Sequence, residues 1–165
     1  MLEVTIRKLN INDWKSVSEI YRQGIETGHA TFEKNVPSWV EWDRKHLPVC
    51  RLVALDGKEV VGWAALTPYS LRDVYKGVAE ISLYVSVIHS RKGIGKQLLK
   101  ALIEESEKKG IWTLQASFFP KNIPSIKLHM SCGFKKIGVR EKIGCMDGKW
   151  RDTVLFERRS RVIGK

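Results

Sequence analysis

The chain has 165 residues, a length that fits one compact domain with a sizeable apolar core. Its composition, 43% hydrophobic and 28% charged, is that of an ordinary globular protein and excludes a disordered or low-complexity polymer. It carries 29 lysines and arginines against 18 acidic residues, and the net charge of +11 indicates anionic partners, either nucleic acid or a small ligand with several phosphates.

Several other classes of protein are excluded by what the sequence lacks. No apolar run approaches the length of a membrane span, and the first residues, MLEVTIRKLN, lack the architecture of a signal peptide. Cys50, Cys132 and Cys145 have neither the spacing of metal ligands nor the even number of a disulfide framework. We therefore expect a cytoplasmic protein without a bound metal. The basic residues are scattered, with no arginine-rich tract, and this favours a solvated basic surface over nucleic-acid binding.

The hydrophobic periodicity of the first half of the chain predicts two helices between strands. The predicted elements are a strand at 4–9, a helix at 13–25, a helix that begins after Ser38, and strands at 51–55 and 59–68. Asn12 can cap the first helix, and Ser38 with Glu41 forms a capping box at the second. Asp56-Gly57, between the two strands, is a strong hairpin signal.

The second half continues with a strand at 78–87, a helix that begins at Ile94, a strand at 112–119, a helix at about 122–132, a strand after Gly133 and, past a hairpin at Asp147-Gly148, a strand at 150–158. The helix after Ile94 has one apolar stripe, so it packs on other structure. The order β-α-α-β-β-β-α-β-α-β-β predicts an α+β fold in a single domain of residues 1–165. Its twisted, mixed sheet is expected to be mostly antiparallel, with one parallel crossover.

The segment HSRKGIGKQ, residues 89–97, places basic residues and two glycines directly before that helix. Glycine lets backbone N–H groups approach a ligand closely, and a helix start carries unpaired N–H donors, so the segment favours an anion such as phosphate. Ser90, Gln97 and Leu98 stand where two common nucleotide-binding motifs require other residues. The remaining interpretations are an N–H nest for a diphosphate and a tight turn that merely uses glycine.

The longer segment YVSVIHSRKGIGKQLLKALIEESEKKG resembles the acetyl-CoA-binding motif of the GNAT N-acetyltransferases, whose core is Arg/Gln-x-x-Gly-x-Gly/Ala. Gly93 and Gly95 match this core, while Ser90 replaces the usual Arg or Gln, a change expected to weaken binding without abolishing it. Four further blocks resemble the phosphinothricin and methionine sulfone acetyltransferase branch: IYRQGIETGHATFE, VVGWAALTPYSLRDVYKGVAEISLYV, PKNIPSIKLHMSCGF and MDGKWRDTVLFER. The resemblance covers nearly the whole chain and implies the GNAT fold.

This resemblance implies a set of contacts with acetyl-CoA as co-substrate. The diphosphate is expected at the turn formed by Arg91, Lys92, Gly93, Ile94, Gly95 and Lys96, and the pantetheine arm beside the backbone of Leu83, Tyr84 and Val85. Asn122 matches a family position that hydrogen-bonds the same arm. One asparagine can fill either role, and the sequence alone favours the N-cap, because Asn122 stands directly before a helix.

Two side chains are candidates for proton transfer. Glu80 lies opposite the apolar face of its strand, so the pattern alone favours a carboxylate that faces water. The resemblance implies that Glu80 is the general base, directly or through a water, and cover by neighbouring structure would favour proton uptake. His129 stands where the branch often has histidine, which implies that it protonates the leaving thiolate at neutral pH. Without the resemblance, a histidine that only packs in its helix is an equal interpretation.

The acceptor side is also implied by the resemblance. Phe32 in ATFE, and Arg72 and Tyr75 in LRDVY, match substrate-side blocks of the branch. Arginine can bind a carboxylate bidentately, and aromatic rings supply apolar walls. The family's PYRxR reads PYSLR here, with Ser70 in place of one arginine, so the identity of the acceptor stays open. By pattern alone, Phe32 can belong to the core and Arg72 can be solvated.

On this resemblance we expect an N-acetyltransferase that acts on phosphinothricin, methionine sulfone or methionine sulfoximine by direct attack in a ternary complex. Enzymes of the branch are commonly homodimers with the C-terminal strands near the partner, so we expect a homodimer. The alternatives are acetylation of a protein N-terminus or a polyamine, which Arg72 disfavours because such acceptors are cationic, and a non-enzymatic basic module that binds a polyanion.

Overall fold

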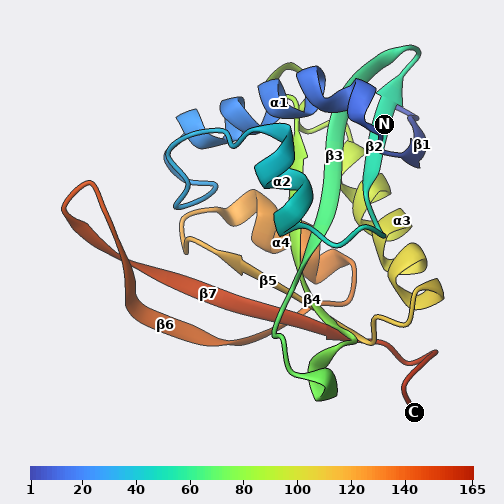
Figure 1. Ribbon diagram of the computed structural model, residues 1–165. Coiled ribbons are helices and arrows are strands. Elements are labelled where there is room, and N and C mark those ends of the chain that lie inside the picture. Colours follow the sequence, from blue (N-terminus) through green and yellow to red (C-terminus); the bar gives the residue numbers. More distant parts are fainter.

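One seven-stranded sheet runs through the chain in the computed structural model, which describes residues 1–165 (Figure 1). Its strands are β1 (Thr5–Lys8), β2 (Leu52–Asp56), β3 (Glu59–Pro68), β4 (Val78–Val85), β5 (Thr113–Phe118), β6 (Lys135–Met146) and β7 (Lys149–Arg159). The helices are α1 (Trp14–Glu26), α2 (Trp39–Lys45), α3 (Ile94–Lys108) and α4 (Ile123–Ser131). The predicted order of strands and helices is confirmed.

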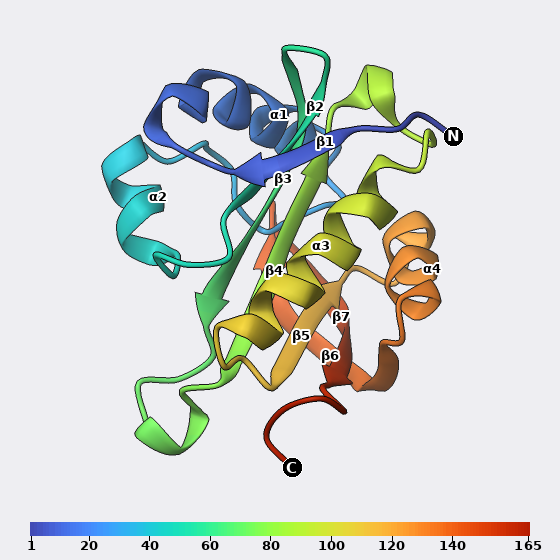
Figure 2. The ribbon, with the colours of Figure 1, turned by 90° about the vertical axis from the view of Figure 1, so that its right-hand side faces the viewer.

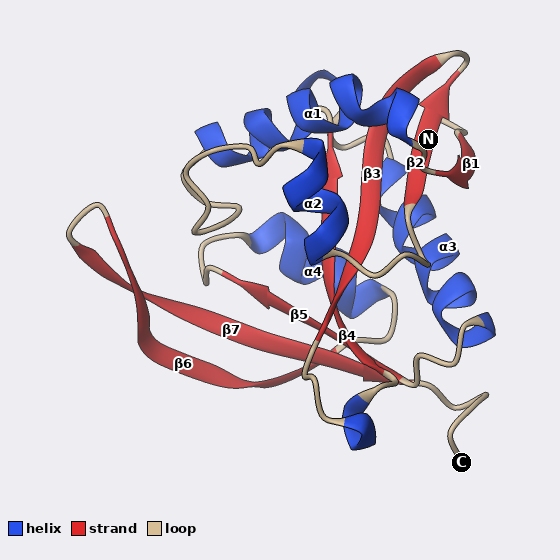
Figure 3. Cartoon of the chain, viewed as in Figure 1, coloured by secondary structure: helices blue, strands red, loops and turns tan.

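The strands lie in the order β1-β2-β3-β4-β5-β7-β6, and every neighbouring pair is antiparallel except β4 and β5. The parallel pair is joined through α3, which confirms the predicted crossover and the mixed, mostly antiparallel sheet. Figure 3 shows the long hairpin of β6 and β7 extending beyond the other strands. β6 is therefore an edge strand with one unpaired side.

Two hydrophobic cores lie on opposite faces of the sheet, under different helices (Figure 2). The predicted apolar stripe of α3 is buried in full: Ile94, Leu98, Leu99, Leu102 and Ile103. On the other face, α1 and α2 cover an aromatic cluster in which Trp42 and Trp63 are fully buried. Their ring centroids are 5.6 Å apart in an edge-to-face arrangement, which adds to the stabilisation from buried area.

The side chains of β4 alternate between these two cores. Ile81, Leu83 and Val85 pack toward α3, whereas Tyr84 packs toward α1. Because successive side chains of a strand point to opposite faces, Glu80 lies on the α1 face with Tyr84. The alternation predicted for this strand is confirmed.

The start of α1 differs from the prediction. A short 3₁₀ turn at Ile11–Asp13 precedes the helix, and Asn10 is the N-cap of this turn. Asn12 lies inside the turn, and the N-cap position of α1 is taken by Asp13, whose side chain makes no cap hydrogen bond to α1. The side chain of Asn10 accepts a hydrogen bond from Asn12 N at 2.9 Å, and Asp13 accepts one from Asn10 N at 2.9 Å. Asp13 also forms an ion pair with Arg7 of β1. This pairing draws the start of the helix to the first strand, which the local sequence does not reveal.

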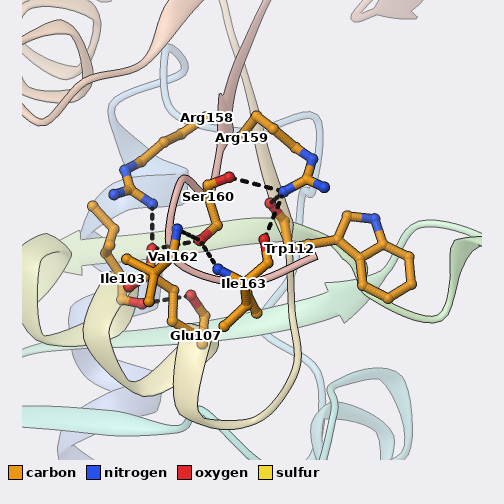
Figure 4. A network of polar contacts seen from close by, with 9 residues as sticks. Ile103, Glu107, Trp112, Arg158, Arg159, Ser160, Val162 and Ile163 are labelled. Carbon is orange, nitrogen blue, oxygen red and sulfur yellow. Dashed lines mark hydrogen bonds and ion pairs between the residues drawn. The ribbon is translucent and has the colours of Figure 1, made fainter. Parts of the chain in front are cut away.

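The C-terminal tail is joined to the end of α3 by a polar network (Figure 4). Glu107 accepts hydrogen bonds from Arg158 at 3.1 Å and from the hydroxyl of Ser160 at 2.9 Å. The backbone N–H of Ser160 donates to Trp112 O at 2.8 Å. These contacts fix the end of β7 against the crossover connection. The glycine turn, residues 91–96, lies at the opposite end of α3.

Candidate active site

The parallel strands β4 and β5 pair over only part of their length. Their ladder joins Val78, Ala79 and Glu80 to Thr113, Leu114 and Gln115, although both strands continue beyond it. Past Glu80 the strands separate, and a cavity of about 810 Å³ opens between them. Residues of both strands, of α4, of the segment after α1 and of β6 line this cavity.

The glycine turn before α3 presents a row of unbonded backbone donors directly after Ser90, which lines this cavity. Ser90 N donates to Val87 O and Gln97 N donates to Gly93 O, but the six N–H groups from Arg91 to Lys96 have no hydrogen-bond acceptor in the protein. Such a row at a helix N-terminus is a site for an anion. The side chains of Arg91, Lys92 and Lys96 form no ion pairs, so their charge is available to a diphosphate.

Two backbone features give this turn its shape. Arg91 and Gly93 both adopt positive φ angles, 61° and 82°, which turns successive N–H groups toward one side. A Cβ atom on Gly93 would lie 2.7 Å from Met1 Cγ, so the N-terminus packs closely over this residue. A Cβ atom on Gly95 would lie 3.1 Å from Leu128 Cδ2, and this glycine therefore lets α3 approach α4.

The separated part of β4 leaves backbone groups free on the side of the opening. Ser86 N donates to Val61 O at 2.8 Å, so the backbone groups of Ser86 face β3. Since alternate residues of a strand bond to alternate sides, Leu83 and Val85 direct their N–H and C=O groups into the opening. The backbone of Tyr84 faces β3 instead. All three residues line the cavity.

Asn122 also lines the cavity, and its side chain caps α4. Its Oδ1 accepts a hydrogen bond from Ser125 N at 3.4 Å. The cap uses the carbonyl oxygen and leaves the amide N–H groups of the same side chain without an acceptor. The two interpretations made from the sequence are therefore compatible, because one atom caps the helix and the other can donate to a ligand.

Glu80 lines the cavity at the point where β4 and β5 separate. It is half-buried, and Gln115 Nε2 donates to its Oε2 at 3.2 Å. Gln115 is its neighbour in the parallel ladder, so the hydrogen bond joins the last pair of side chains before the opening. This contact orients the carboxylate and leaves oxygen lone pairs for a proton or a water.

His129 lies on α4 and is almost fully buried, with 3% of its surface exposed, yet it also lines the cavity. Its Nδ1 lies 2.8 Å from Ser125 O, an acceptor only, so Nδ1 carries the hydrogen. Nε2 has no partner. Burial lowers the pKa of His129 to about 4, so the ring is neutral at neutral pH and Nε2 is a proton acceptor. The expected imidazolium donor is therefore absent from the free protein.

The segment after α1 forms the wall of the cavity opposite α4. Phe32 packs edge-to-face on Phe119, with ring centroids 4.8 Å apart, and its ring fills the space beside Gly144, where a Cβ atom would lie 2.5 Å from it. Arg151 of β7 donates to Gly28 O at 2.6 Å and its guanidinium lies 3.6 Å from the centre of the Phe119 ring. The β6–β7 hairpin thus holds this wall in place.

Arg72 and Tyr75 do not line this cavity. They lie on the exposed connection between β3 and β4, where Arg72 stacks over the Tyr75 ring at 5.5 Å. Phe32 is the one residue of the three predicted acceptor contacts that the fold brings to the cavity.

Residues of the C-terminal hairpin also line the cavity and were not among the predicted site residues. Arg140, Ile143 and Thr153 line the cavity, although they are distant in sequence from every motif. An arginine on a strand looks like an ordinary solvated residue, so no local signal identifies Arg140. Gly144 is a weak signal, because a glycine inside a strand often marks close approach by another group.

Comparison with known proteins agrees with this geometry. Residues 14–134 match the acetyltransferase (GNAT) family, and the chain belongs to this family. It is 33% identical over 161 residues to phosphinothricin N-acetyltransferase of Alcaligenes faecalis, covering 93% of this chain and 81% of the relative. It is 29% identical over 160 residues to L-methionine sulfoximine/L-methionine sulfone acetyltransferase of Salmonella typhimurium, covering 93% of both chains.

A solved structure extends the likeness to three dimensions. The phosphinothricin acetyltransferase of Sinorhizobium meliloti, crystallised in complex with acetyl-CoA, superposes with a TM-score of 0.86 at 31% identity, covering 96% of this chain and 89% of the other. The GNAT fold expected from the sequence is thereby confirmed, and the chain is an N-acetyltransferase.

Two further observations bear on partners. No group of three or more His, Cys, Asp or Glu side chains is placed to hold a metal ion. None of the helices combines the length and the hydropathy that a membrane crossing needs.

The protonation state of His129 can be measured directly. In a ¹⁵N NMR titration of the free protein, the His129 ring should appear as the Nδ1–H form and titrate near pH 4, because burial disfavours its charge. The pKa in an unfolded chain is about 6.5, so the stability that the neutral ring contributes is present above that pH and is lost as the pH falls toward 4. A midpoint near 6.5, or an Nε2–H tautomer, would contradict this assignment.

Proposed function

We propose that this chain transfers the acetyl group of acetyl-CoA to the amino group of a small amino-acid analogue. The observation that carries the proposal is the row of unbonded N–H groups from Arg91 to Lys96, beside a cavity that Glu80 lines. Relatives named for phosphinothricin, methionine sulfoximine and methionine sulfone support this class of acceptor, since all three compounds are α-amino acids. The residues present fit acetyl-CoA, because the row suits a diphosphate and the free edge of β4 suits an amide-containing arm.

The acceptor amine must lose a proton before it can attack, because an ammonium nitrogen has no lone pair. We propose that Glu80 takes this proton, directly or through one water, with Gln115 holding its carboxylate. The amine then attacks the acetyl carbonyl in a ternary complex. The Val85 N–H, directed into the opening, is suited to stabilise the negative charge that develops on the carbonyl oxygen.

Attack releases a second proton from the nitrogen and leaves a thiolate that needs one. We propose that His129 Nε2 accepts this proton and passes it to the thiolate. The transfer removes the positive charge on the nitrogen and the negative charge on the sulfur. This assignment follows from the free Nε2 and the neutral ring, and it makes His129 an acceptor first and a donor second.

The acceptor side of the cavity is proposed to lie against Phe32, whose ring position is fixed by Phe119 and Gly144. Glu80 is the only carboxylate that lines the cavity. A polyamine would carry several positive charges into a space that also holds Lys121 and Arg140, so the charge distribution favours an acceptor with its own negative group. A contact of Arg72 and Tyr75 with the acceptor stays a prediction.

The function is tested by release of free thiol from acetyl-CoA in the presence of candidate acceptors. Methionine sulfone, methionine sulfoximine and phosphinothricin should each accelerate release, whereas spermidine and a peptide with a free N-terminus should not. Turnover of the polyamine or the peptide that is faster than turnover of the three amino-acid analogues would contradict the proposed acceptor class. Absence of acetyl-CoA binding by calorimetry would contradict the enzyme assignment itself.

The role of Glu80 is tested by Glu80→Gln, which keeps the shape and the position of the side chain but removes the base. We expect kcat to fall by roughly 10²-fold, with binding of acetyl-CoA unchanged. The loss should shrink as pH rises, because a larger share of the acceptor is then already deprotonated. Unchanged turnover at neutral pH would remove Glu80 from the mechanism.

We also propose that the protein is a homodimer that associates through the β6–β7 hairpin. β6 is an unpaired edge strand, and the hairpin exposes four large apolar side chains to between 48% and 65%: Ile137, Val139, Ile143 and Trp150. An apolar edge of this kind favours pairing with a second chain.

Light scattering after gel filtration tests the dimer. The measured molar mass should be twice the 18.9 kDa of one chain. Trp150→Glu should lower the measured mass toward that of the monomer, because the introduced charge disrupts an apolar contact. A wild-type protein at the monomer mass at micromolar concentration would contradict the proposal.

A further inference from the structure

Arg140 is a cavity-lining cation that the mechanism above does not use. It lies on β6, paired across the hairpin with Thr153, which is buried and lines the same cavity. Directly opposed residues of neighbouring strands share one face of a sheet, so Arg140 extends from the face that Thr153 occupies.

The register of the strands places Arg140 on the same face as Glu80. Glu80 is opposite Gln115, and Gln115 is opposite Glu157 of β7. Thr153 is four residues before Glu157 on that strand, which returns it to the same face. The Glu80 carboxylate and the Arg140 guanidinium therefore belong to one side of the sheet and to one cavity, separated by β5 and β7.

The guanidinium of Arg140 has no partner within the protein. It takes part in none of the ion pairs and lies over no aromatic ring. Its side chain is exposed, so a ligand in the cavity can reach it. A planar guanidinium with free N–H groups matches a carboxylate in charge and in shape.

The other cationic side chains near the cavity are less suited to bind a carboxylate. Arg151 already donates a hydrogen bond to Gly28 O and stacks on Phe119, so its guanidinium is occupied by contacts within the cavity wall. Lys121 directly precedes Asn122 at the start of α4, on the side where the pantetheine arm is expected. Arg72, the residue that the sequence favoured, lies outside the cavity.

We propose that Arg140 binds the α-carboxylate of the acceptor, while Glu80, on the same face, receives the proton of its α-ammonium group. This inference rests on the proposed function and defines it further: the acceptor is a free α-amino acid rather than an amine in general. The selectivity comes from pairing one cavity cation with the one cavity carboxylate, each matched to one charge of a zwitterion.

The proposal is tested with two acceptors that differ only in the carboxylate, L-methionine sulfone and 3-(methylsulfonyl)propan-1-amine. For each, kcat/KM is measured at saturating acetyl-CoA with wild type, Arg140→Gln and Arg140→Lys. Arg140→Gln should lower kcat/KM for methionine sulfone by about 10- to 100-fold, the loss expected for a charge-assisted hydrogen-bonded pair. The same variant should leave kcat/KM for the carboxylate-free amine unchanged. Arg140→Lys should recover part of the loss, since it keeps the charge without the bidentate geometry.

Arg161→Gln serves as the matched control, because it removes one exposed, unpaired arginine from the C-terminal tail and changes the net charge equally. Equal losses with both acceptors for Arg140→Gln, or a selective loss with Arg72→Gln in its place, would overturn the assignment of Arg140. Wild type that fails to use methionine sulfone, methionine sulfoximine and phosphinothricin would instead overturn the proposed function, and this inference with it.

Discussion

The separation of β4 from β5 after three residue pairs is the constraint on which the rest of the site depends. Backbone N–H and C=O groups that a sheet would normally pair are left open on one side of β4, and six further N–H groups, in the turn before α3 and its first residues, are also unbonded. Main-chain polar groups without a partner in the protein are free to bind a ligand. A long ligand with a diphosphate and amide groups supplies partners for both sets.

The two faces of the sheet carry different residues of the site. On one face, Gly95 lets α3 pack closely against α4, and His129 of α4 is almost fully buried. On the other face, Glu80 lies near the wall formed by the segment after α1 and by the hairpin of β6 and β7. The cavity joins both faces where the strands separate, so a donor held at α3 and an acceptor held near Phe32 can meet beside Glu80.

Local patterns predicted much of this fold, because strands, helix stripes and hairpin turns are encoded over a few residues. The α3 stripe and the turn at Asp147-Gly148 are examples, and the order of elements follows from them. The prediction that Asn12 caps α1 was wrong, because Asp13 at the start of the helix forms an ion pair with Arg7 of β1. Such a contact depends on the tertiary structure and leaves no trace in the neighbouring sequence.

The site was predictable only in part, for the same reason. The glycine turn, Glu80 and His129 stand in recognisable segments, whereas Arg140 reaches the cavity because β6 pairs at the far edge of the sheet. The protonation of His129 depends on burial and on Ser125 O, neither of which a sequence displays. Arg72 matched a family block, yet the connection that carries it projects into solvent away from the cavity lining.

The central claim is that backbone amides at the start of α3 bind the diphosphate of coenzyme A. Titration of ¹⁵N-labelled protein with coenzyme A, followed by amide NMR, tests it most directly. The account predicts large, saturable shifts of the Arg91–Lys96 amide signals with coenzyme A and none with pantetheine, which lacks the diphosphate. Unshifted signals in this segment, despite binding measured by calorimetry, would contradict the account.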